Sequence, residues 1–152
     1  MKKIIVTLFL SILTMIASAQ LNAGDNVYLE FQNTEGEVNV DGTDACNMLK
    51  EYIEDKSTLQ IVSSKQESDF TFLLSVIEKN QGVRKGKIDI IDSKTKDVIF
   101  ESKWKRGTSG FSMWTWTGEV IEASTYGFSG TRMAIGKIFK GKILRKFKEI
   151  KK

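Results

Sequence analysis

The chain has 152 residues, of which 28% are charged and 41% hydrophobic, and it contains one cysteine but no histidine and no proline. The absence of histidine excludes Ser–His and Cys–His catalytic pairs and removes the commonest protein ligand of zinc, copper and iron. We therefore expect no metal and no cofactor. The formal net charge is only +4, which is too small to predict a nucleic-acid partner.

The first twenty residues, MKKIIVTLFLSILTMIASAQ, are typical of an export signal. Two lysines precede an apolar run from Ile4 to Ile16, and Ala17 and Ala19 occupy the positions that a signal peptidase reads. This pattern predicts a cleaved signal over residues 1–19 and a mature chain that is exported to the periplasm or beyond the cell. A retained anchor is the alternative. Residues 20–152 carry a net charge of only +2 and are expected to form one domain.

The mature chain begins with an alternating segment, 26–32, that predicts a strand. Residues 44–56 predict a helix, because Ala45, Leu49 and Ile53 recur at four-residue spacing. Cys46 lies beside this apolar stripe and is expected to pack as a small hydrophobe.

Four further strands are predicted at 58–64, 68–80, 87–92 and 97–106, and a helix is predicted over 131–152. The strand at 68–80 is apolar on both faces, which is typical of a central strand. "QGVRKG" is interpreted as the loop that follows it. The order β-α-β-β-β-β-α predicts an α+β fold with a single mixed or antiparallel sheet of about five strands and two helices packed on one face.

Part of this pattern resembles small bacterial envelope domains. A helix leads to a strand in "ACNMLKEYIEDKSTLQIVSSKQESDFTFLLSVI", and the hairpin "GKIDIIDSKTKDVIFES" follows. In this respect the chain is similar to the amino-terminal domain of the translocation protein TolB and to CsgG-type periplasmic domains, with Asp69–Phe70 and Asp92 at the matching positions. The resemblance implies a binding or assembly domain rather than a catalyst, with these residues serving the core and the turns.

Three tryptophans are the candidate ligand-binding residues. Trp114 and Trp116 stand two apart in "GFSMWTWTG", and Trp104 precedes them at the end of a predicted strand. In an extended segment Trp114 and Trp116 would point to the same face, roughly 7 Å apart, and could stack on successive sugar rings or clamp a peptide. The rings could equally belong to the core, since large aromatic residues dominate protein interiors. The core interpretation is favoured.

The predicted carboxy-terminal helix has an apolar stripe and a basic face. The stripe consists of Ile135, Phe139, Ile143, Phe147 and Ile150. Candidate membrane or partner contacts on the basic face are Lys137, Lys140, Arg145 and Lys148. Such a helix could lie on an anionic membrane, but packing on the sheet with its lysines in water is favoured. Gly136 and Gly141 are expected to allow close approach of the helix to the sheet.

These observations predict an exported, non-enzymatic binding or assembly module of the bacterial cell envelope. The partner is expected to be an envelope protein or a saccharide of unknown identity. A membrane-surface protein that uses its basic helix is one alternative. A hydrolase with a Ser/Lys or carboxylate site is the other, because those chemistries need no histidine.

Overall fold

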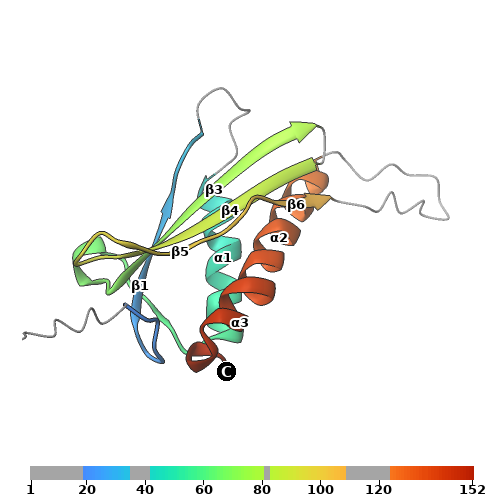
Figure 1. The fold of residues 1–152 in the computed structure, drawn as a ribbon. Coiled ribbons are helices and arrows are strands. Elements are labelled where there is room, and N and C mark those ends of the chain that lie inside the picture. The colour runs from blue at the N-terminus through green and yellow to red at the C-terminus, as the bar shows by residue number, and fades with distance from the viewer. Residues whose placement is uncertain (1–18, 35–41, 81–82, 109–123) are drawn as a thin grey trace, which may run out of the picture.

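The structure is a computed structural model that describes residues 19–34, 42–80, 83–108 and 124–152 (Figure 1). The strands are β1 (Asn26–Phe31), β2 (Gln60–Ile61), β3 (Phe70–Asn80), β4 (Val83–Asp92), β5 (Val98–Glu101) and β6 (Lys105–Thr108). The α-helices are α1 (Gly42–Lys56), α2 (Ser124–Ile138) and α3 (Leu144–Lys146). The remaining helical turns are η1 (Lys65–Glu67), the π-helical η2 (Phe139–Ile143) and η3 (Lys148–Ile150).

The strands form one mixed sheet with the order β2-β1-β3-β4-β5, and β6 pairs with β4 beyond the end of β5. β1 runs parallel to both β2 and β3, whereas β3, β4 and β5 are antiparallel neighbours. β3 therefore lies at the centre, as its two apolar faces predicted. The single mixed sheet with two main helices confirms the predicted α+β fold.

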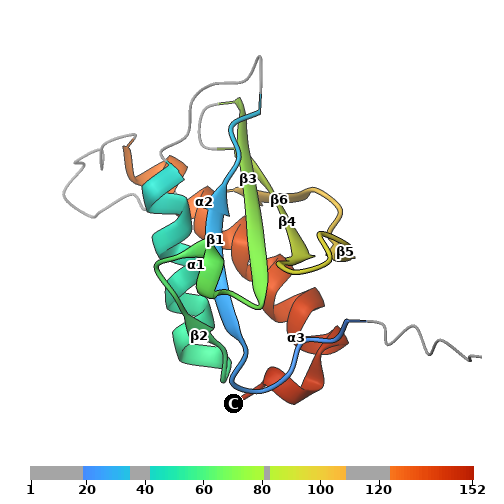
Figure 2. The ribbon, with the colours of Figure 1, turned by 90° about the vertical axis from the view of Figure 1, so that its left-hand side faces the viewer.

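α1 and α2 lie side by side on one face of the sheet, and the core fills the space between them and the strands (Figures 1 and 2). Alternate residues of β3 and β4, including Phe72, Leu74 and Ile88, are fully buried on this face. Leu49 of α1 and Ile135 of α2 meet them from the helical layer. The alternate residues of the strands and the apolar stripes of the helices thus face each other and form one core.

Three strand predictions differ from the structure. The predicted strand 58–64 is shortened to β2, Gln60–Ile61. β4 begins at Val83, so most of the predicted "QGVRKG" loop belongs to a long β3–β4 hairpin. The predicted strand 97–106 is divided into β5 and β6 by residues 102–104. At this division Ser102 is buried and its Oγ accepts a hydrogen bond from the Ile88 N–H at 2.9 Å. The hydroxyl thus stands in for a backbone acceptor where the regular ladder is interrupted.

The carboxy-terminal helix packs on the sheet, as predicted, and all five residues of its apolar stripe are at most 4% exposed. It includes a π-helical turn, η2, in the middle of the stripe. In a regular α-helix a spacing of four residues rotates by roughly 40° per step. A π turn holds more residues per turn, so it reduces this rotation and keeps Phe139 and Ile143 directed at the core.

The two helix glycines differ from the expectation of a close approach to the sheet. A Cβ at Gly136 would lie 2.7 Å from the Tyr52 hydroxyl of α1, and a Cβ at Gly141 would have no atom within 4 Å. The close contact of α2 with the sheet is made instead at Gly107 of β6, which lies against Gly130.

Candidate functional site

The three tryptophans do not form a described site. Trp114 and Trp116 lie outside the described residues, so their role as a platform or as core stays a prediction. Trp104 lies between β5 and β6 and is 40% exposed.

The strongest concentration of charge lies on the outer side of the carboxy-terminal helical segment, and we call it the basic surface. It contains all four residues predicted as membrane or partner contacts. Its eight exposed cations are Lys137, Lys140, Lys142, Arg145, Lys146, Lys148, Lys151 and Lys152. Glu149 is the single acid within the same sixteen residues.

Within the described part of the chain, none of the eight cations forms an ion pair. Lys137 Nζ and Lys146 Nζ each donate a hydrogen bond of 2.9 Å to a backbone carbonyl, that of Arg106 and that of Ile99 respectively. Lys152 Nζ donates to the carbonyl of Glu54. Cations elsewhere do have acidic partners, such as Arg84 with Glu78, Lys87 with Asp89 and Arg132 with Glu51. The positive charge of the basic surface is therefore not neutralised by close ion pairs with the described residues, and Lys140 and Lys152 interact with Asp55 only at longer range.

Two of the basic-surface lysines lie over aromatic rings. Lys140 Nζ is 4.9 Å from the centroid of Tyr52, whose ring also has the Arg132 guanidinium at 5.7 Å. Lys146 Nζ is 5.4 Å from the Phe100 ring and 5.2 Å from the Phe147 ring. These cation–π contacts attract the lysines without removing their charge.

An open hollow of about 450 Å³ lies beside the basic surface, between α1 and α2. It is lined by Glu51, Tyr52, Glu54, Asp55 and Arg132. The hydrogen bond and charge of Lys56 lower the pKa of Asp55, with smaller contributions from Lys152 and Lys140. The Glu51–Arg132 pair, at 2.6 Å, and the Tyr52 hydroxyl bond to the Arg132 carbonyl tie the two helices together across this hollow. No local sequence pattern indicates this cluster, because about 80 residues separate its two halves.

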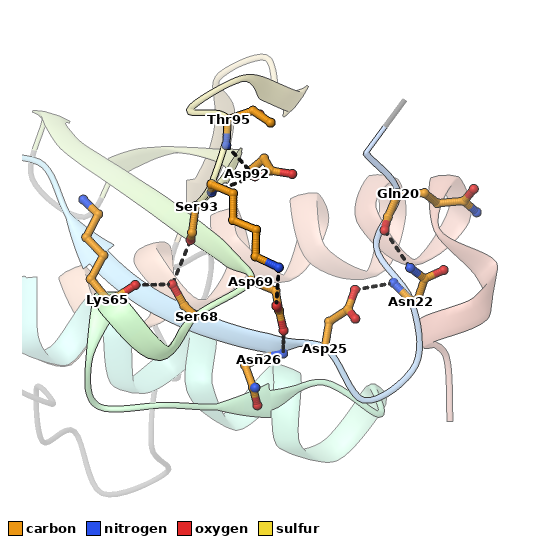
Figure 3. Close-up of polar contacts among 11 residues, drawn as sticks. Gln20, Asn22, Asp25, Asn26, Lys65, Ser68, Asp69, Asp92, Ser93 and Thr95 are labelled. Carbon is orange, nitrogen blue, oxygen red and sulfur yellow. Dashed lines mark hydrogen bonds and ion pairs between the residues drawn. The ribbon is translucent and has the colours of Figure 1, made fainter. Parts of the chain in front are cut away.

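A second hollow, of about 240 Å³, lies where η1 meets the turn between β4 and β5. Three lysines and two serines are among its lining residues, which are Lys65, Gln66, Ser68, Ser93, Lys94 and Lys96. The hydroxyls of Ser68 and Ser93 are 2.8 Å apart, and Ser68 Oγ also donates to the Lys65 carbonyl (Figure 3).

Serine and lysine side chains thus meet in this hollow without a hydrogen bond between their functional groups. Lys65 Nζ contacts Glu30 at 2.5 Å, Lys94 Nζ contacts Asp69 at 3.8 Å and Lys96 Nζ donates to the Ser93 carbonyl. No described lysine amine hydrogen-bonds to either serine hydroxyl. A Ser/Lys nucleophile needs that contact.

Asp69 and Asp92 stabilise the loops at the same end of the sheet. Asp69 Oδ2 accepts a hydrogen bond of 3.0 Å from the Asn26 N–H, which ties the start of β3 to the start of β1 (Figure 3). Asp92 Oδ1 accepts from the N–H groups of Lys94 and Thr95 at 2.8 and 2.9 Å. These bonds, that of Thr95 foremost, lower the pKa of Asp92. Asp92 therefore stabilises the turn between β4 and β5, whereas Asp69 joins the starts of two strands.

Two kinds of feature are absent from the described residues. No cluster of three or more potential metal-ligating side chains occurs among them. None of their helices is both long and apolar enough to cross a membrane.

No protein-family model and no curated protein sequence matches the chain. Solved structures are similar in fold. The dodecameric PelC from Paraburkholderia phytofirmans is 14% identical, with a TM-score of 0.50, and the match covers 77% of this chain and 90% of that one. A hypothetical protein from Chlamydia trachomatis is 8% identical, with a TM-score of 0.51, and the match covers 81% of this chain and 95% of that one. The chain therefore shares its α+β fold with these two proteins.

Proposed function

We propose that the protein is an exported, non-enzymatic binding module of the bacterial cell envelope that holds an anionic partner on its basic surface. The observation that carries this proposal is the set of eight exposed cations that form no ion pair with any described residue. Charges that are left without partners in a folded domain set up a local field that attracts ions of the opposite sign.

The charge of the mature chain is strongly segregated. Residues 137–152 carry eight cations and one acid, whereas residues 20–136 carry 13 cations and 18 acids. The modest net charge therefore conceals a basic region on an otherwise acidic domain. At physiological ionic strength the Debye length is about 8 Å, so a partner must lie close to the basic surface to be attracted by it. Binding is expected to weaken as salt is added.

The envelope location rests on the predicted export signal over residues 1–19. The comparisons do not show the resemblance to TolB and CsgG-type domains. The non-enzymatic character is supported by two observations. The chain has no histidine, and the described lysines near Ser68 and Ser93 contact carboxylates or a carbonyl instead of the hydroxyls.

The test is binding of the mature chain to a soluble polyanion, dextran sulfate, with neutral dextran as the reference. A variant of the basic surface, Lys142→Gln/Arg145→Gln/Lys148→Gln/Lys151→Gln, removes four exposed cations. A matched control, Lys50→Gln/Lys65→Gln/Lys94→Gln/Lys96→Gln, removes four exposed cations elsewhere. We expect wild type and control to bind dextran sulfate alike, and the basic-surface variant to bind at least tenfold more weakly. Equal loss in both variants would show that only net charge matters and would refute the proposal.

Self-assembly is a second candidate, favoured by the sheet face that points away from the helices. No described helix covers this face (Figure 2), although Thr71, Ser75 and Ile77 on it are at most 7% exposed. Leu73 and Ile91 are half-buried there, and Val98 is 57% exposed. PelC, which has a similar fold, is a dodecamer.

Light scattering on the mature chain tests the assembly candidate. If the sheet face that points away from the helices joins copies of the chain, the protein should be larger than a monomer, and Leu73→Glu should reduce it to a monomer. A wild-type chain that remains monomeric at high concentration would rule this candidate out and leave the binding proposal unaffected.

A further inference from the structure

We infer that the anionic partner of the basic surface is the headgroup layer of a phospholipid bilayer. The inference rests on the proposed function and names its partner. Two features of the structure support it: the exposure of the basic surface and the burial of the apolar stripe beneath it.

Neither of the two hollows that the described residues line includes any of the eight cations of the basic surface. Sites for small molecules are concave and combine apolar walls with a few polar groups. The basic surface instead follows the outer side of a helical layer, and Lys140 and Lys146 lie over the rings of Tyr52, Phe100 and Phe147. An extended, exposed array of cations matches an extended array of phosphate groups better than it matches a single sugar or peptide.

The structure also determines how such contact can occur. An amphipathic helix usually binds a membrane by inserting its apolar face. Here that face belongs to the core, because Ile135, Phe139 and Ile143 are fully buried. Insertion would require the helix to leave the sheet. We therefore expect the folded domain to bind by charge alone, with the cations at the level of the headgroups.

Each Lys or Arg near an anionic lipid surface contributes roughly a fivefold gain in binding. The four cations Lys142, Arg145, Lys148 and Lys151 together are thus expected to contribute about two to three orders of magnitude.

The experiment is cosedimentation of the mature chain, residues 20–152, with two kinds of vesicle. One contains only phosphatidylcholine, and the other contains phosphatidylcholine with about one third phosphatidylglycerol. The chain should bind the anionic vesicles alone and should be released by about 0.5 M salt. The variant with four cations replaced should bind about a hundredfold more weakly, whereas the matched control should bind like wild type. Circular dichroism melts of both variants verify that they are folded.

Each contrary outcome has a distinct meaning. Binding to dextran sulfate without binding to anionic vesicles would overturn the lipid assignment and leave the proposed function standing. Binding to neither would overturn both. Vesicle binding that survives high salt, or that is unchanged in the basic-surface variant, would contradict a purely electrostatic contact through these cations.

Discussion

A Cβ atom built on Gly107 of β6 would lie 1.8 Å from the carbonyl oxygen of Gly130 in α2. It would also lie 2.7 Å from the backbone nitrogen of Ala134. The neighbours are backbone atoms, so a side-chain rotation cannot relieve the overlap. The two glycines thus allow the first part of α2 to rest directly on the edge of the sheet, and they fix the height of the helix above it.

Gly107→Ala is therefore expected to destabilise the protein by at least about 1–3 kcal/mol, the usual cost of overpacking a well-packed site. Gly141→Ala is the matched control, because a Cβ there meets no atom within 4 Å. Alanine favours helix over glycine by about 1 kcal/mol, so the control should be neutral or stabilising. Urea denaturation of both variants measures the difference, and a Gly107→Ala protein as stable as wild type would contradict the close approach.

The turn after β4 predicts a defined pH dependence. The pKa of Asp92 is lowered from 3.8 in the folded state by hydrogen bonds from Thr95 and Lys94. The stabilisation by the ionised carboxylate is then complete above the unfolded pKa and is lost as pH falls through the lower folded pKa. Asp92→Asn should consequently be less stable than wild type at neutral pH, and the gap should close below about pH 3. Thermal melts at several pH values measure the gap, and a constant gap would refute this assignment.

Deleting residues 132–152 should unfold the domain. The segment contributes several fully buried side chains, among them Ile135, Phe139 and Ile150. Burial of each large apolar side chain is worth about 1.5–3 kcal/mol, and the free energy of unfolding of a domain is only about 5–15 kcal/mol. Calorimetry on a chain that ends at Thr131 should show no cooperative transition. A chain ending at Ile150 should keep one, because it retains the whole apolar stripe.

The mature protein is expected to begin at Gln20. Leu21 is fully buried, whereas Gln20 is exposed, so cleavage after Ala19 keeps Leu21 in the core and removes only the partly buried Ala19 from its edge. Amino-terminal sequencing of the exported protein would verify the site. Recovery of Met1 in a membrane fraction would instead show a retained anchor.

The sequence alone determined the fold class and the main elements. Apolar residues at a spacing of two predicted the strands, and the four-residue stripe predicted the carboxy-terminal helix, because each pattern reports which side of a local element is removed from water. The burial of that stripe was predicted for the same reason. Asp92 was recognised as a turn residue because its hydrogen bonds to Lys94 and Thr95 are local.

Only the tertiary structure decided the strand order, the division between β5 and β6, and the environment of each cation on the basic surface. Lys140 lies over Tyr52, and Lys146 donates to the Ile99 carbonyl, although 47 residues separate that second pair. Such contacts depend on how α1, α2 and the sheet edge are placed relative to one another, which no local periodicity encodes. The sequence alone shows that eight cations lie in the carboxy-terminal segment. Only the fold determines that, among the described residues, Lys137, Lys140, Lys146 and Lys152 meet a ring or a carbonyl and that none of the eight forms an ion pair with a carboxylate.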